Sequence, residues 1–216
     1  MADKAAKKPT EDTLSGEPRR IPVLVQAFVL GSFAMVAAAL LAGGDLKTHD
    51  AIEARHAEDL KASLAQVVPA ALHDNDLLAQ PLTTEADPGM PATVYRALKD
   101  GKVTAVAFEI VGYGYGGAIR LIMGIGRDGR ILGVRVLSHS ETPGLGDRVE
   151  VARSPWIKGF DGLGEDNTTN KEWAVKKDGG RFDQFTGATI TPRAVVKAVK
   201  AGLDRFARHR KQWLTP

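Results

Sequence analysis

The sequence contains no cysteine among its 216 residues. Without thiols there are no disulfides, thiolate zinc sites, iron–sulfur clusters or cysteine nucleophiles. Histidine is also scarce, and the five histidines form no short-spaced pair of metal ligands: His49, His56, His73, His139 and His209. We therefore expect no metal site, and a redox function would need an organic cofactor.

A strong charge of one sign is absent as well. The formal net charge is +3, and no stretch alternates Lys and Arg with aromatic side chains as a nucleic-acid-binding surface does. We therefore expect no nucleic acid among the partners. A hydrolase is disfavoured because no nucleophile elbow occurs, and Ser138, His139 and Glu141 lie too close in sequence for an ordinary triad.

Residues 21–43 lack any charged side chain. A helix over these 23 residues is roughly 35 Å long, which is enough to cross a bilayer. The alternative is a cleaved secretory signal, whose apolar region usually has only about 7 to 15 residues. The length therefore favours a single transmembrane helix over 21–43.

The basic residues around this segment predict its orientation. Residues 1–20 have no apolar periodicity and are predicted to form a flexible tail. Five basic residues precede the segment: Lys4, Lys7, Lys8, Arg19 and Arg20. Only Lys47 and Arg55 follow it closely. Because Lys and Arg favour the cytoplasmic side, we expect a cytoplasmic tail and a domain of residues 44–216 outside the cytoplasm.

Hydrophobic periodicity indicates the elements of that domain. A helix is expected over 48–68, before Pro69, and three strands are expected at Val103–Val111, Ala118–Ile125 and Ile131–Leu137. A last helix is expected to begin with Thr191 as N-cap and Pro192 at its first position, with Val195, Val199, Leu203 and Phe206 along one face. This order predicts an α+β domain with an antiparallel sheet.

The segment Asp183–Thr189 lies directly before the last helix. A helix N-terminus has unpaired amide donors and a partial positive charge, both of which favour a phosphate. Gly187 and Ala188 leave room for its approach, and Thr189 supplies a hydroxyl at that place. On these grounds alone, the segment either holds a phosphate or simply caps the helix.

Two loops have compositions that suit ligand binding. In His139–Gly146, Pro143 and Gly144 fix a bend, Leu145 can cover an apolar ring face, and Glu141 and Thr142 can orient the loop. Four of the six residues in 112–117 are glycine. For each loop, a plain solvated turn remains the alternative.

Together these segments resemble the FMN-binding domain family shared by the G subunit of the Rnf-type electron transport complex and the B and C subunits of the sodium-pumping NADH:quinone reductase. The resemblance covers residues 21–208 and includes Ser154–Phe160. It implies that Thr189 takes FMN through a phosphoester bond, and that a separate flavin transferase with FAD as donor recognises Asp183. It also implies that the following residues surround the flavin: Glu141, Thr142, Pro143, Gly144, Leu145, Gly146, Thr186, Gly187 and Ala188.

The resemblance further implies a covalent-FMN electron carrier in an ion-translocating oxidoreductase complex of the inner membrane, with the domain of residues 44–216 in the periplasm. The G subunit of the Rnf type, which links ferredoxin and NAD chemistry to ion movement, fits best. Its expected partners are the other membrane and peripheral subunits and the transferase, and no complete reaction is expected from this chain alone. The C subunit of the quinone reductase and an anchored module without flavin are the alternatives, whereas the single span excludes the B subunit.

Overall fold

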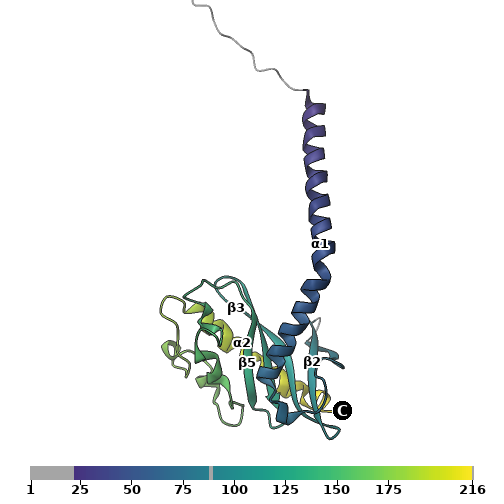
Figure 1. The fold of residues 1–216 in the computed structure, drawn as a ribbon. Coiled ribbons are helices and arrows are strands. Elements are labelled where there is room, and N and C mark those ends of the chain that lie inside the picture. Colours follow the sequence, from purple (N-terminus) through teal and green to yellow (C-terminus); the bar gives the residue numbers. More distant parts are fainter. Residues whose placement is uncertain (1–21, 88–89, 216) are drawn as a thin grey trace, which may run out of the picture. The chain divides into compact units, whose positions relative to one another are not determined.

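The computed structural model describes residues 22–87 and 90–215 (Figure 1). The chain divides into two compact units, the first ending at Ile52 and the second beginning at Glu53. The tail expected over residues 1–20 lies outside the described residues.

Helix α1 (Val23–Val67) is 45 residues long. The expected membrane helix and the expected helix over 48–68 are one continuous element, because Gly43 and Gly44 stay within it. Glycine in a helix interior costs only about 1 kcal/mol, which is too little to end a long helix by itself. In the first unit its apolar side chains are uncovered, with Phe28 76% and Leu40 73% exposed. By length and composition this helix can cross a membrane.

The second unit contains one antiparallel sheet with the strand order β1-β2-β3-β4-β5. The strands are β1 (Leu82–Asp87), β2 (Met90–Lys99), β3 (Lys102–Tyr113), β4 (Ala118–Gly126) and β5 (Ile131–Ser138). The three expected strands are confirmed as β3, β4 and β5. Strands β1 and β2 were not expected, since Pro91 lies within β2 and proline argues against a strand.

Helix α2 (Ile190–Trp213) and the end of α1 pack on opposite faces of the sheet. Alternate residues of β3 belong to two separate hydrophobic clusters, as expected when successive side chains of a strand point to opposite faces. Val106 and Phe108 pack with α2, whereas Ala105 and Ala107 pack with the end of α1. The apolar face expected for α2 is confirmed as buried: Val195, Val199, Leu203 and Phe206. The expected α+β fold is confirmed.

Between β5 and α2 the chain forms short 3₁₀ helices, as it also does once after α1. They are η1 (Ala70–Leu72), η2 (Asp147–Val149), η3 (Pro155–Phe160), η4 (Asn170–Glu172) and η5 (Lys176–Asp178). Aromatic rings join this connector into one cluster through edge-on and stacked contacts: Trp156, Phe160, Trp173, Phe182 and Phe185. The connector therefore has an apolar core continuous with that of the sheet.

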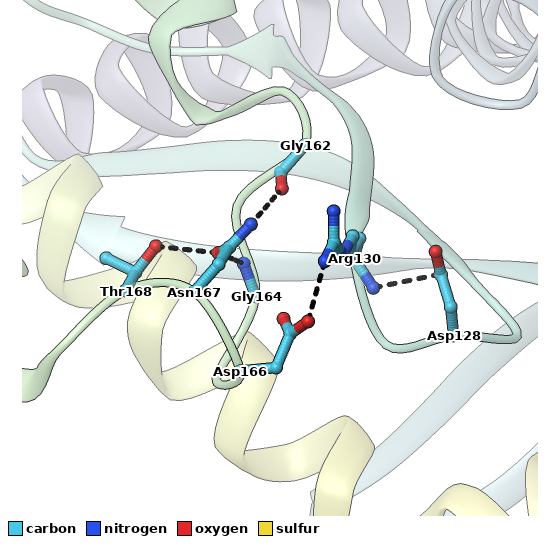
Figure 2. Close-up of polar contacts among 7 residues, drawn as sticks. All are labelled: Asp128, Arg130, Gly162, Gly164, Asp166, Asn167 and Thr168. Carbon is cyan, nitrogen blue, oxygen red and sulfur yellow. Dashed lines mark hydrogen bonds and ion pairs between the residues drawn. The ribbon is translucent and has the colours of Figure 1, made fainter.

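A polar network fixes the loop after η3 to the β4–β5 turn (Figure 2). The Asn167 side chain accepts from the Gly164 amide at 2.8 Å and donates to the Gly162 carbonyl at 2.9 Å. Arg130 beside the turn pairs with Asp166 at 2.8 Å. The polar side chains in this loop thus satisfy backbone groups and hold the connector beside the sheet.

The start of α2 differs from the expectation. Thr189 is the N-cap, so Thr191 and Pro192 are the second and third helical residues. The prediction of Thr191 as N-cap was wrong because its buried hydroxyl donates to the Glu141 carboxylate. Proline is tolerated in this first turn, where backbone amides have no acceptor within the helix.

Gly124→Ala tests the contact between β4 and the end of α1. An added Cβ at Gly124 would lie 2.2 Å from the Val67 carbonyl oxygen, so the two elements must separate. We expect a loss of about 1–3 kcal/mol of stability, measured as a lower melting temperature of the full chain in detergent. Gly159→Ala is the control, because its added Cβ meets no described atom within 4 Å. Equal melting temperatures for the two variants would contradict this packing.

Candidate functional site

A cavity of about 340 Å³ opens at the N-terminal end of α2. Ligand pockets range from about 300 to 1,000 Å³, so a small cofactor can enter it. Its walls come from three segments far apart in sequence, namely the glycine-rich loop, the loop after β5, and the turn into α2. The lining residues are Tyr115, Glu141, Thr142, Leu145, Gly146, Gly187, Ala188, Thr189, Ile190 and Thr191.

The structure brings together most of the residues that the sequence indicated. Seven of them line this cavity: Glu141, Thr142, Leu145, Gly146, Gly187, Ala188 and Thr189. Pro143 and Gly144 in the loop after β5 and Thr186 in the turn before α2 are exposed, but they do not line the cavity. Sequence reasoning missed Tyr115, Ile190 and Thr191. No residue of the glycine-rich loop was assigned to the site, Ile190 lies between the expected segment and the expected helix, and Thr191 was taken for a cap.

The turn before α2 is closed by a hydrogen bond from the Ala188 amide to the Phe185 carbonyl at 3.1 Å. Gly187 has φ +83°, which the third residue of a type II turn requires. An added Cβ at Gly187 would lie 3.3 Å from the Leu145 side chain, so this turn and the loop after β5 are in close contact. The buried Phe185 anchors the turn in the aromatic cluster.

Thr189 lies half-buried at the helix start, and its hydroxyl caps no amide of α2. The side chain is thus not committed to the capping role that threonine commonly has at this position. The amides of the first turn, with the exception of Pro192, have no acceptor within the helix. The Thr189 hydroxyl and these free backbone amides lie together beside the cavity, and this arrangement suits the binding of a phosphate.

Glu141 connects the three walls. The residue is 5% exposed, and its carboxylate accepts from the Gly116 amide at 2.8 Å and the Tyr115 amide at 3.3 Å. It also accepts a hydrogen bond from the Thr191 hydroxyl. These donors compensate for the removal of the charge from water.

Close backbone approach explains two of the glycines near this carboxylate. An added Cβ at Gly116 would lie 2.0 Å from the Ser140 carbonyl oxygen, and one at Gly146 would lie 2.8 Å from the Glu141 Cβ. A larger residue at Gly116 would push the glycine-rich loop away from the loop after β5, and one at Gly146 would collide with the Glu141 side chain.

The loop after β5 is held by further hydrogen bonds. His139 Nδ1 accepts from the Glu141 amide at 3.0 Å, and its Nε2 lies 2.7 Å from Glu150. This arrangement places the ring proton on Nε2, which donates to Glu150. The amides of Leu145 and Gly146 both donate to the Thr142 carbonyl, at 3.1 and 3.0 Å, so the loop itself uses these two donors.

Asp183 does not line the cavity. Its side chain is exposed and pairs with Lys176 at 2.6 Å. The Trp156 indole donates to its carbonyl at 2.8 Å. Asp183 faces a second groove of about 540 Å³, lined in part by Arg148 and Arg181. Among residues 22–87 and 90–215, no three His, Asp or Glu side chains are grouped so that they could hold a metal ion.

Residues 114–204 match the family model of the FMN-binding domain, and this range includes all three walls of the cavity. Two relatives, each named as the G subunit of an ion-translocating oxidoreductase complex, align over most of the chain. The one from Cereibacter sphaeroides is 52% identical over 214 residues, which covers 96% of this chain and 97% of the relative. The one from Stutzerimonas stutzeri is 53% identical over 194 residues, which covers 89% and 84%. The chain belongs to this family of G subunits.

The crystal structure of NqrC from Shewanella oneidensis matches this member of the G-subunit family with a TM-score of 0.44 and 26% identity, covering 68% of this chain and 73% of that one. Relatives at 40–53% identity over most of the chain are named as G subunits. The expected resemblance to the G subunit is therefore confirmed.

An ion pair between Asp178 and Arg193 ties η5 to the first turn of α2, with N–O distances of 2.6 and 2.7 Å. The hydrogen bonds from Arg193 lower the pKa of the Asp178 carboxyl. Because the pKa is lower in the folded state than in the unfolded state, the pair stabilises the fold above the unfolded pKa. This stabilisation is lost as the pH falls through the folded pKa.

We therefore expect Asp178→Asn to lower the melting temperature at neutral pH, and the difference from the unmodified chain to disappear as the pH falls from about 5 to about 2. Thermal unfolding at several pH values measures this. Arg193→Gln and the double variant are the controls, since either single change should remove the whole effect. A difference that does not depend on pH would contradict the assignment.

Proposed function

We propose that FMN is attached to Thr189 through a phosphoester bond, and that the chain carries electrons as the G subunit of an ion-translocating oxidoreductase complex. One observation carries the proposal: Thr189, whose hydroxyl caps no helix amide, lines the same cavity as the first turn of α2 and the loop after β5. The family match to an FMN-binding domain over this region supports FMN as the ligand.

The lining residues suit the two chemically different parts of FMN. The first-turn amides of α2 can bind the phosphate, and Gly187 leaves the approach to them open. Leu145, Ile190 and Tyr115 provide apolar and aromatic surface for the ring system. A flavin supplies one- and two-electron chemistry, so the protein itself need only bind, orient and shield it.

The attachment would be made by a flavin transferase that uses FAD as donor. The Thr189 oxygen forms a new bond to the phosphorus of the FMN half, the phosphoanhydride bond of FAD breaks, and AMP leaves while the hydroxyl proton passes to a base of the transferase. The exposed side chain of Asp183, next to the turn that presents Thr189, is accessible for recognition by this enzyme.

In the complex, ferredoxin and NAD would bind other subunits, and this chain would pass electrons between membrane and peripheral partners. The names of the relatives support membership in such a complex. Helix α1 would anchor the chain in the inner membrane, with the N-terminus in the cytoplasm and residues 44–216 in the periplasm, as the basic residues before the span indicate. Anchoring raises the effective concentration of the carrier near its partners.

Thr189→Val should abolish covalent flavin. Co-expressed with a flavin transferase, the unmodified chain should fluoresce on a denaturing gel and carry the added mass of FMN less water. The valine variant, which lacks the hydroxyl, should be dark and have the mass of the polypeptide alone. Thr168→Val is the control, because Thr168 loses the same hydroxyl but lies outside the cavity and outside the Asp183–Thr189 segment.

A dark band from the unmodified chain would favour an anchored binding module without flavin. A fluorescent band from Thr189→Val would place the attachment at another residue. Either result contradicts the proposal.

The absence of native cysteine makes the orientation directly testable. We expect a cysteine at exposed Lys171 to react with a membrane-impermeant maleimide in intact spheroplasts. A cysteine at Ser15 should react only after lysis, because positions before the span are expected in the cytoplasm. The reverse labelling pattern would contradict a periplasmic domain.

A further inference from the structure

A flavin held only by a phosphoester would be retained without being oriented. Several rotatable bonds separate the phosphate from the ring system, so the orientation of the ring must come from the walls of the cavity. Those walls are three segments that share no secondary-structure element: residues 112–117, residues 139–146 and the turn into α2. Whatever joins these segments therefore determines how firmly the ring is held.

We propose that Glu141 is a positioning residue: with Thr191, it locks the three walls together and so immobilises a flavin tethered at Thr189. This inference rests on the proposed function. Its hydrogen bonds reach both other walls, through the Tyr115 and Gly116 amides on one side and the Thr191 hydroxyl on the other.

The surroundings of the carboxylate hold it in place. An added Cβ at Gly114 would lie 2.4 Å from Glu141 Oε1, and one at Gly146 would lie 3.0 Å from Oε2. The carboxylate thus fills the space between two backbones and has little freedom to change rotamer. With three protein donors, it acts on the cavity through the segments it joins.

The hydrogen bond from Thr191 to Glu141 can be removed with a smaller change in side-chain shape than the other contacts between the walls. Valine has nearly the shape of threonine but cannot donate a hydrogen bond. Thr191→Val therefore frees the start of α2 from Glu141 and leaves the buried carboxylate with fewer donors, which weakens its hold on the glycine loop as well.

The experiment compares Thr191→Val, Thr191→Ser and the unmodified full chain in detergent, each after co-expression with a flavin transferase. Two readouts are taken: circular dichroism in the visible flavin bands, which requires a fixed ring, and hydrogen exchange of the Tyr115 and Gly116 amides. For Thr191→Val we expect most of the flavin dichroism to be lost and exchange at least about tenfold faster, as fits the loss of a charge-assisted hydrogen bond. Thr191→Ser, which keeps a hydroxyl, should restore both.

Thr168→Val is the matched control. Thr168 is also buried, and its hydroxyl donates to the Asn167 side chain at 3.0 Å, outside the cavity walls. The Thr168→Val variant loses a buried hydroxyl, as Thr191→Val does, so it shows how much of the change in the two readouts comes from general destabilisation of the domain. Its flavin dichroism and the exchange of the two loop amides should match those of the unmodified chain.

Unchanged dichroism and exchange in Thr191→Val would overturn the inference, as would a serine variant that behaves like valine. If the unmodified chain carries no flavin, the proposed function fails and the immobilisation of a flavin fails with it, while the exchange of the two amides still decides whether Glu141 and Thr191 join the walls. If Thr191→Val does not fold, Glu141→Gln replaces it, because its single amide oxygen cannot serve all three donors. Exchange in that variant equal to the unmodified chain would then overturn the inference.

Discussion

The close packing of α2 on β3 determines where Thr189 lies. The buried face of the helix sets its position over the sheet, and Gly112 in β3 allows the backbones to approach near the first turn of α2. An added Cβ at Gly112 would lie 2.9 Å from the Ala194 carbonyl oxygen. The helix start is therefore held by the hydrophobic core of the domain, and the residue just before it takes a fixed position at the cavity.

The cavity itself needs polar contacts in addition to this packing. The loop after β5 and the glycine-rich loop have few apolar side chains to bury, so the hydrophobic core alone does not place them. The Glu141 carboxylate and its donors supply the missing order, and the glycines around it leave room for the glycine-rich loop, the loop after β5 and the Thr191 side chain to meet. The site thus combines a rigid element, α2, with two loops that depend on one buried charge.

Local patterns predicted the parts of the fold whose side chains alternate or repeat regularly. Strands β3 to β5 and the apolar face of α2 are of this kind, whereas β1 at the sheet edge and its neighbour β2 alternate only weakly, and β2 contains Pro91. Thr191 was misassigned because a Thr-Pro pair is typical of a helix start, while its actual partner, Glu141, is 50 residues away. The two loop motifs were found from their own residues, but their meeting at one cavity and the contribution of Tyr115 depend on tertiary structure.

The rim of the cavity has a composition consistent with a carrier that exchanges electrons with other proteins. Tyr115 is 77% exposed, Ile190 46% and Leu145 41%, so the walls leave one side of the cavity open and partly apolar. An enclosed site would lengthen the path for electrons, and a fully open one would leave a flavin ring in water without fixed orientation. The covalent tether proposed at Thr189 would prevent dissociation from such an open site, and the walls would then need to supply only orientation. A cavity of this size and openness is therefore sufficient for an attached flavin, although it would hold a freely exchanging one only weakly.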